Sequence, residues 1–184
     1  MNRRDFLKKW GAATAAASMP GLLSSVSQAG AQPSGSGPNI VFILADDMGY
    51  GDPGCYNPDS RIPTPNIDSL AETGMQFNNA HAPGTWCAPS RYALLTGRFP
   101  LRTHIQKIRH SSAIEATRET IGTLLQKNGY ETGCVGKWHL GIEDGWKDRD
   151  WSQPMRGGPV DRGFDYYFGL AASLDIPPYY YIKN

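Results

Sequence analysis

The hydrophobic positions of this chain fall into short runs separated by turn residues, a pattern typical of alternating strands and helices. Residues 39–45 are apolar after the first, and such a run predicts a strand buried on both faces of a parallel sheet. Residues 75–80 and 130–136 are two further strand candidates. We therefore expect an α/β fold with a sheet core flanked by helices.

Two segments carry the end signals of short helices. Residues 64–74 have Thr64 in the N-cap position, Pro65 at the first helical position and Gly74 just past the end. A second helix is bracketed by Pro89 and Gly97. The latter bracket places Cys87 at or just before the amino end of that helix. A third, amphipathic helix is expected over residues 119–128, with Gly129 as its cap and with three inward positions, Ile121, Leu124 and Leu125.

Polar side chains follow the predicted strands at the points where they end. Asp46 and Asp47 come directly after the first apolar run, and Lys137 and His139 fall at the end of residues 130–136. Lys137 and His139 alternate around Trp138, so on an extended segment they face the same side. In open α/β sheets this edge binds ligands, so we expect one site here, joined by the start of the Cys87 helix.

The residue types leave more than one chemistry open. An acidic pair after a strand is often a solvated turn or helix cap, yet clustered carboxylate oxygens also suit a hard cation such as Ca²⁺. A helix amino end favours the thiolate of Cys87 as a nucleophile, whereas a buried structural cysteine is the alternative. A soft thiolate is a poor ligand for a hard cation, so the two interpretations conflict.

The segment that bears on this conflict is Cys87-Ala88-Pro89-Ser90-Arg91-Tyr92-Ala93-Leu94-Leu95-Thr96-Gly97. It resembles the signature at which type I sulfatases oxidise a cysteine to formylglycine, because Cys87, Pro89 and Arg91 match its Cys-x-Pro-x-Arg core. Three further blocks occur in the family's order: Asp46-Asp47, Gly136-Lys137-Trp138-His139-Leu140-Gly141, and Ser173-Leu174-Asp175. The resemblance spans almost the whole chain after the leader and implies an alkaline-phosphatase-like α/β fold.

The resemblance implies a sulfuric ester hydrolase that acts on sulfated carbohydrates or aryl sulfates. Its catalytic residues would be formylglycine from Cys87, Arg91 holding the hydrate, Lys137 binding sulfate and hydrate, and His139 acting on a hydrate hydroxyl. Ser173 would bind near the sulfate, although many family members carry histidine where this chain has Leu174. Asp46, Asp47 and modified Cys87 would hold Ca²⁺, with Mg²⁺ as the alternative.

Two rival functions share these residues. A phosphonate or phosphate ester hydrolase of the same superfamily can use the same formylglycine. An inactive sulfoglycan-binding relative would keep Cys87 as a thiol, but such a protein has no need of an intact maturation signal. A cysteine phosphatase would need arginine six positions after the cysteine, where this chain has Ala93.

Residues 1–31 read as an export signal, with a basic start, a weakly apolar middle and a small-residue cleavage zone. Arg3-Arg4 resembles a twin-arginine signal, and an ordinary secretory signal is the alternative. The interrupted apolar part is too short for a membrane span. We therefore expect residues 32–38 to be a linker and residues 39–184 to be the N-terminal part of a periplasmic or secreted sulfatase domain, with further metal and substrate residues beyond Asn184.

The net charge and the number of cysteines limit the kinds of partner and of disulfide that this chain can have. Without residues 1–31 the formal net charge is about −2, which gives no basic face for nucleic acid. Three cysteines leave at least one unpaired. A Cys55–Cys134 disulfide is one alternative, and a small buried strand position for Cys134 is the other.

Residues 144–163 are expected to form an irregular loop shaping the mouth of the site. The tyrosines at 166, 167 and 179–181 either stack on sugar rings or are core or strand residues.

Overall fold

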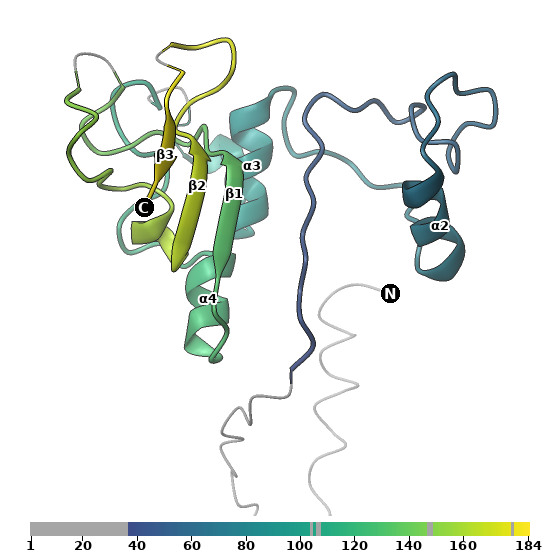
Figure 1. Cartoon of the computed structure of the whole chain (residues 1–184), viewed down its shortest axis with the longest axis horizontal. Helices are drawn as coiled ribbons and strands as arrows, with labels where there is room; N and C mark the ends of the chain where they lie inside the picture. The colour runs from purple at the N-terminus through teal and green to yellow at the C-terminus, as the bar shows by residue number, and fades with distance from the viewer. Residues whose placement is uncertain (1–36, 104, 106–107, 147–148, 178) are drawn as a thin grey trace, which may run out of the picture. The chain divides into compact units, whose positions relative to one another are not determined.

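The structure is a computed structural model that describes residues 37–103, 105, 108–146, 149–177 and 179–184 (Figure 1). The predicted leader and most of the linker lie outside these residues. Along the chain the elements are α2 (Pro65–Thr73), α3 (Cys87–Thr96), η1 (Pro100–Arg102), α4 (Ile121–Lys127), β1 (Gly133–Lys137), η3 (Val160–Arg162), β2 (Tyr166–Leu170) and β3 (Tyr181–Lys183). This is the mixed α/β fold that the sequence predicts.

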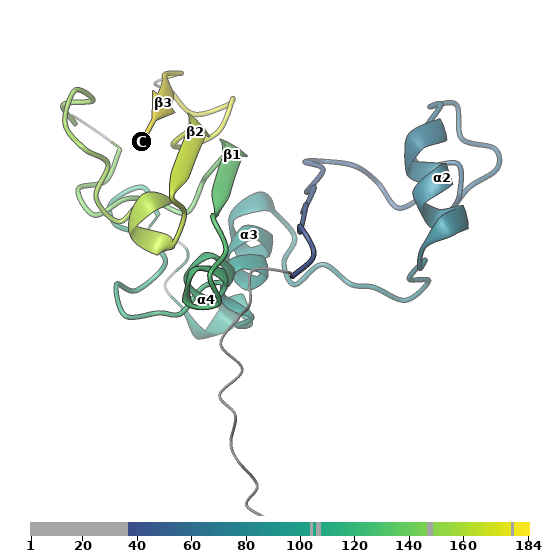
Figure 2. The ribbon, with the colours of Figure 1, turned by 60° about the horizontal axis from the view of Figure 1, so that its bottom comes forward.

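The sheet has the strand order β1-β2-β3, with β2 in the middle (Figures 1 and 2). β1 and β2 are parallel, and their register pairs Lys137 with Leu170. β2 and β3 are antiparallel, and Leu170 also pairs with Tyr181. The bounds of β2 and β3 were not predicted, but the strand interpretation of the tyrosine runs is confirmed for Tyr166, Tyr167 and Tyr181.

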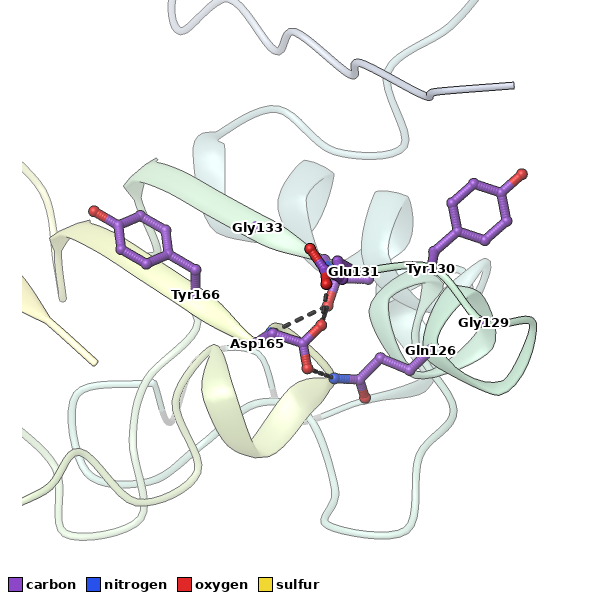
Figure 3. Close-up of a pocket in the computed structure, with 8 residues that line it drawn as sticks. Gln126, Gly129, Tyr130, Glu131, Gly133, Asp165 and Tyr166 are labelled. Atoms are coloured by element: carbon purple, nitrogen blue, oxygen red, sulfur yellow. Dashed lines mark hydrogen bonds between the residues drawn. The ribbon is translucent and has the colours of Figure 1, made fainter. Parts of the chain in front are cut away.

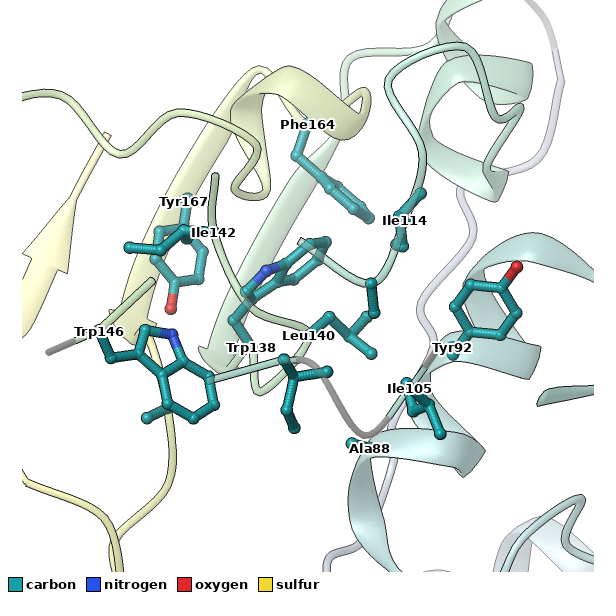
Figure 4. Close-up of a cluster of buried hydrophobic side chains, with 13 residues drawn as sticks. Ala88, Tyr92, Ile105, Ile114, Trp138, Leu140, Ile142, Trp146, Phe164 and Tyr167 are labelled. Atoms are coloured by element: carbon teal, nitrogen blue, oxygen red, sulfur yellow. The ribbon is translucent and has the colours of Figure 1, made fainter. Parts of the chain in front are cut away.

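One hydrophobic core joins α3 to one face of the sheet (Figure 4). Tyr92 of α3, Trp138 after β1 and Tyr167 of β2 are each at most 2% exposed. Tyr167 is therefore a core residue and not a sugar-stacking one, whereas the side chains of residues 179–181 are exposed. On the opposite face of the sheet the side chains of Tyr166 and Phe168 are exposed.

The three predicted helices are present, with differences at their ends. α3 begins at Cys87 and ends against Gly97, whose left-handed backbone lets its amide donate to the Ala93 carbonyl, as predicted. The hydroxyl of Thr64 does not cap α2. It accepts a hydrogen bond from the Gly54 amide at 2.8 Å and donates to Asp68 Oδ1 at 3.0 Å.

α4 buries a narrower face than its apolar pattern predicts. The helix starts at Ile121 behind a capping box formed by Thr120 and Thr123. The prediction that Leu124 faces inward is wrong, since this side chain is 48% exposed. The buried position is Gly122, which lies so close to the backbone of residues 162–163 that a Cβ there would clash. This close approach sets which face of α4 is turned inward.

Two predicted strands are absent from the structure. Residues 39–45 pair with no other segment among the described residues, and Val41 is 83% exposed. Residues 75–80 are also irregular, with Phe77 exposed. An apolar run indicates a preference for burial. A strand also needs a neighbouring segment whose backbone amides and carbonyls pair with its own. The described residues offer none to these two segments.

The remaining expectations about cysteines and loops are partly met. All three cysteines are free, and Cys134 is a half-buried residue of β1 whose burial raises its pKa to about 11. Residues 144–146 and 149–163 are mostly irregular, but they contain η3 and the buried Trp146. No helix in the described part of the chain is long and apolar enough to cross a membrane.

The description of the core predicts different effects on stability for a buried and an exposed leucine. Leu140 is 0% exposed in the core, whereas Leu101 is 85% exposed in η1. Leu140→Ala should lower the free energy of unfolding by about 2–5 kcal/mol because it leaves a cavity. Leu101→Ala should change it by less than about 0.5 kcal/mol. Urea denaturation followed by fluorescence measures both, and equal effects would contradict the core described here.

Candidate active site

The predicted site residues meet where β1 ends and α3 begins. Cys87 is the first residue of α3, and its Sγ lies 3.0 Å from Nδ1 of His139, which is 52 positions away in the sequence. The backbone amide of His139 donates to the Ala171 carbonyl at 3.1 Å, which continues the β1–β2 pairing past the strand ends. Thus the strand-end rule correctly placed Cys87 beside the Lys137–His139 segment.

His139 does not sit on an extended segment, which corrects that detail of the prediction. Its φ of +55° turns the chain in the left-handed region. The imidazole still reaches the site because the turn points it at Cys87, while Lys137 reaches the site from the last position of β1.

Arg91 points back at the site, as its position one helical turn after Cys87 predicts. Its Nη1 donates to the carbonyl oxygen of Lys137 at 2.6 Å, and its Nη2 lies 3.5 Å from Oδ1 of Asp46. The side chain is only 13% exposed. Its Nε is buried and has no acceptor among the described residues, so one donor of the fork remains unused.

Lys137 and Arg91 share the carboxylate of Asp46. Lys137 Nζ donates to Asp46 Oδ2 at 2.8 Å. This hydrogen bond, and the charges of Lys137 and Arg91, hold the pKa of Asp46 below its ordinary value. Directly after it, Asp47 has a φ of +61°, so the chain turns sharply at this acidic pair.

His139 is enclosed by aromatic rings that the sequence did not indicate. The ring of Trp146 lies 5.7 Å from the imidazole and that of Trp86 lies 6.3 Å away. Burial lowers the pKa of His139 to about 4, and the nearby charges of Lys137 and Arg91 act in the same direction. His139 is therefore neutral at pH 7 and presents one acceptor nitrogen.

Ser173 lies in a tight turn after β2 and is 4% exposed. Its hydroxyl donates to the carboxylate of Asp175, and the Ile176 amide donates to the Ser173 carbonyl at 3.2 Å. The hydrogen bond from Ser173 is the main cause that lowers the pKa of Asp175, and the charges of Lys137 and His139 contribute. Sequence reasoning gave Asp175 no role, although the Ser-x-Asp spacing that suits such a turn was visible.

The donor set tests whether these residues alone fit a divalent cation. Ca²⁺ takes about 6–8 oxygen ligands. Asp46 and Asp47 supply hard oxygens of the right kind, but no group of three His, Cys, Asp or Glu side chains in the described ranges is arranged to hold a metal. Asp46 is moreover engaged by two cations. The described residues therefore do not complete a metal site.

A surface hollow lies at the opposite end of β1 (Figure 3). There Asp165 accepts hydrogen bonds from Gln126 and from both the amide and the hydroxyl of Thr132. Because Asp165 is satisfied by groups of α4 and of the chain entering β1, we assign it a structural role.

Comparison with known proteins identifies the family of this chain. The family model described as Sulfatase matches residues 38–183. The chain belongs to the sulfatase family. It is 40% identical over 151 residues to the N-acetylgalactosamine-6-O-sulfatase of Bacteroides thetaiotaomicron, covering 80% of this chain and 29% of that protein. It is also 40% identical to human arylsulfatase G, covering 77% of this chain and 25% of that one.

Solved structures support the same assignment and the alkaline-phosphatase-like fold. A structure from work on glycosaminoglycan metabolism by Bacteroides thetaiotaomicron has a TM-score of 0.72 and 40% identity, covering 80% of this chain and 31% of that one. The crystal structure of Ps i-CgsB in complex with k-i-k-neocarrahexaose has a TM-score of 0.55 and 35% identity, covering 71% and 27%. The chain thus spans only about a quarter to a third of the length of these relatives.

The enclosure of His139 predicts an unusual titration. Its imidazole should titrate near pH 4, compared with an ordinary value of 6.5, when followed by NMR of the ring. Because the unfolded chain binds the proton from about pH 6.5 and the folded protein only near pH 4, the free energy of unfolding should fall as pH is lowered between these values.

The control is His139→Gln, which removes the titrating group and should remove that part of the pH dependence. A folded-state midpoint near 6.5 would instead mean that water and counter-charges reach the ring.

Proposed function

We propose that this protein hydrolyses sulfate esters with a formylglycine made from Cys87. The observation that carries the proposal is the 3.0 Å approach of Cys87 Sγ to His139 Nδ1, within reach of the charges of Lys137 and Arg91. The Sγ atom marks the place where an oxygen of the aldehyde hydrate would sit. An acceptor nitrogen beside a two-oxygen nucleophile, with Lys137 and Arg91 nearby, suits an anionic ester.

The proposed reaction has two steps that this chain's residues serve. One hydroxyl of the hydrated aldehyde attacks sulfur, the S–O bond to the alcohol breaks, and the alcohol leaves with a proton. The second hydroxyl then loses its proton to His139, the Cβ–O–S linkage breaks at carbon, and sulfate leaves as the aldehyde forms again. His139 can accept that proton because its buried ring is neutral at pH 7.

Lys137 and Arg91 have different roles in this proposal: Lys137 binds the anion, and Arg91 orients the start of α3. Lys137 has three donors, of which one is given to Asp46, so it can also bind sulfate oxygens and the hydrate. Arg91 holds its fork between the Lys137 carbonyl and Asp46 and orients the start of α3. The helix amino end at Cys87 adds backbone donors for an anion.

We propose that Asp46 and Asp47 also contribute oxygens to a divalent cation, Ca²⁺ or Mg²⁺, together with an oxygen at position 87. The remaining ligands would come from outside the described residues. When bound, the cation would supply positive charge against the anionic ester.

The relatives' names support the substrate class. One acts as an N-acetylgalactosamine-6-O-sulfatase, two are arylsulfatases, and one is solved with a neocarrahexaose. We propose sulfated carbohydrates or aryl sulfates as substrates. We also propose that residues 1–31 direct the protein through the twin-arginine machinery to the periplasm or beyond, after a maturation enzyme has oxidised Cys87.

The modification is tested by the mass of the tryptic peptide Ile62–Arg91. In protein made by the native host, this peptide should carry an aldehyde in place of the CH₂SH group of Cys87. The peptide Asn128–Lys137 contains Cys134 outside any such signature and should keep its thiol. An unmodified thiol at both positions, in a host that matures other sulfatases, would contradict the proposal.

Turnover by the full-length enzyme tests the reaction. It should hydrolyse 4-nitrophenyl sulfate faster than a phenyl phosphonate ester, and Cys87→Ala should abolish both activities. Lys137→Ala should lower kcat by about 10²–10³ because a charged donor to the transition state is lost. Lys127→Ala, an exposed lysine on α4, is the charge-matched control and should stay within about twofold of wild type. Preference for the phosphonate would favour the rival hydrolase.

A further inference from the structure

Trp86 occupies a position that its side chain does not suit. It is the N-cap residue of α3, and it makes no side-chain capping hydrogen bond there. Ser, Thr, Asp and Asn are preferred at N-cap positions because their side chains accept from the free amides of the first turn. A residue that breaks such a local preference next to the proposed nucleophile is a candidate for a functional role.

Trp86 is also the accessible one of the two rings beside His139. The centroid of the Trp146 ring lies 5.7 Å from that of the imidazole, and the centroid of the Trp86 ring lies 6.3 Å away. Trp146 is 5% exposed and belongs to the core (Figure 4), whereas Trp86 is 45% exposed. Packing in the core therefore explains the position of Trp146. It does not explain an exposed tryptophan on the same imidazole.

The exposed ring lies next to the place where the ester would react. Trp86 directly precedes Cys87, and the imidazole that it contacts lies 3.0 Å from Cys87 Sγ. The ring of an aryl sulfate is joined to sulfur through one oxygen, and the ring of a sugar 6-sulfate through one oxygen and one carbon. With sulfur at the nucleophile, the first ring of the alcohol is thus held within a few bond lengths of position 87.

The other side chains of the site do not provide a surface for such a ring. Lys137, Arg91 and Asp46 form a charged cluster, which suits the sulfate group and not an uncharged ring. An indole offers a large, flat apolar surface that packs against an aromatic ring or against the apolar face of a sugar. Trp86 brings this surface to the edge of the charged cluster.

We propose that Trp86 is a specificity-determining residue, whose exposed indole packs against the first ring of the alcohol esterified to sulfate. The charged side chains bind the sulfate, and Trp86 binds the ring, which is either an aryl ring or the apolar face of a sugar. This inference rests on the proposed function and assigns a residue to the part of the substrate beyond the sulfate.

The test measures how three sulfonates inhibit the hydrolysis of 4-nitrophenyl sulfate by the mature full-length enzyme. Benzenesulfonate, cyclohexanesulfonate and methanesulfonate carry the same anionic group and are not hydrolysed, so each Ki reports binding alone. The readout is the Ki of methanesulfonate divided by the Ki of each ring compound. A change in folding or in the charged cluster alters all three Ki values alike and cancels in this ratio.

Trp86→Ser should lower the ratio about three- to tenfold, which is the range that one aromatic contact supports. Serine suits the N-cap position, so this variant removes the ring without weakening the start of α3. Trp86→Phe keeps an aromatic ring and should keep the ratio within about twofold of wild type. Phe99→Ala is the matched control, because Phe99 is an aromatic residue that is 52% exposed just after α3, and it should also stay within about twofold.

The outcomes distinguish the inference from the proposed function. A loss for benzenesulfonate alone would assign Trp86 to aryl rings, and a loss for cyclohexanesulfonate would assign it to the apolar face of a sugar. Wild-type ratios in Trp86→Ser, or an equal loss in Phe99→Ala, would overturn the inference and leave sulfate ester hydrolysis standing. A mature wild-type enzyme that hydrolyses no sulfate ester would overturn the proposed function, and the inference with it.

Discussion

The site depends on one carboxylate that two cations share. Asp46 lies 3.5 Å from Arg91 Nη2 and 2.8 Å from Lys137 Nζ, and these three residues come from segments far apart in the sequence. Two positive side chains that are only 13% and 17% exposed would repel each other if the carboxylate were absent. Pairing at this depth is screened less by salt than pairing on an open surface. Asp46 therefore allows both cations to face the same place and still leaves one net positive charge for an anion.

The same network holds the nucleophile position in place. The guanidinium of Arg91 is a planar fork, so bonding to the Lys137 carbonyl and to Asp46 together restricts its orientation. Because Arg91 lies one turn after Cys87 on α3, this restriction also fixes the first turn of the helix against His139. Burial, together with the charges of Lys137 and Arg91, lowers the pKa of His139, and the neutral imidazole avoids a third positive charge in the cluster.

What the sequence predicted, and what it missed, follow from the range of the forces involved. α3 was predictable because Pro89 and Gly97 mark its two ends, and Lys137 was predicted at the site because it ends β1, where the start of α3 was also expected. The prediction of a buried strand over residues 39–45 was wrong because the burial of a strand depends on partners elsewhere in the chain. Trp86 and Trp146 could not be linked to His139, since loop packing has no periodic signal. Asp175 left a signal in its spacing to Ser173, but only the hydrogen bond shows its partner.

The spacing between the Lys137–His139 segment and the turn that follows β2 is set by backbone pairing and not by side chains. The register places Lys137 opposite Leu170, and two amide hydrogen bonds extend this pairing through Trp138 and His139. Trp138 stays buried between the two site residues, and its indole donates to the Gly141 carbonyl at 3.0 Å, which anchors the segment from the core side. Replacing a surface side chain therefore leaves the distance between the Lys137–His139 segment and the turn after β2 unchanged. Such a backbone allows an exposed side chain of the turn, such as Leu174, to change without moving Lys137 and His139.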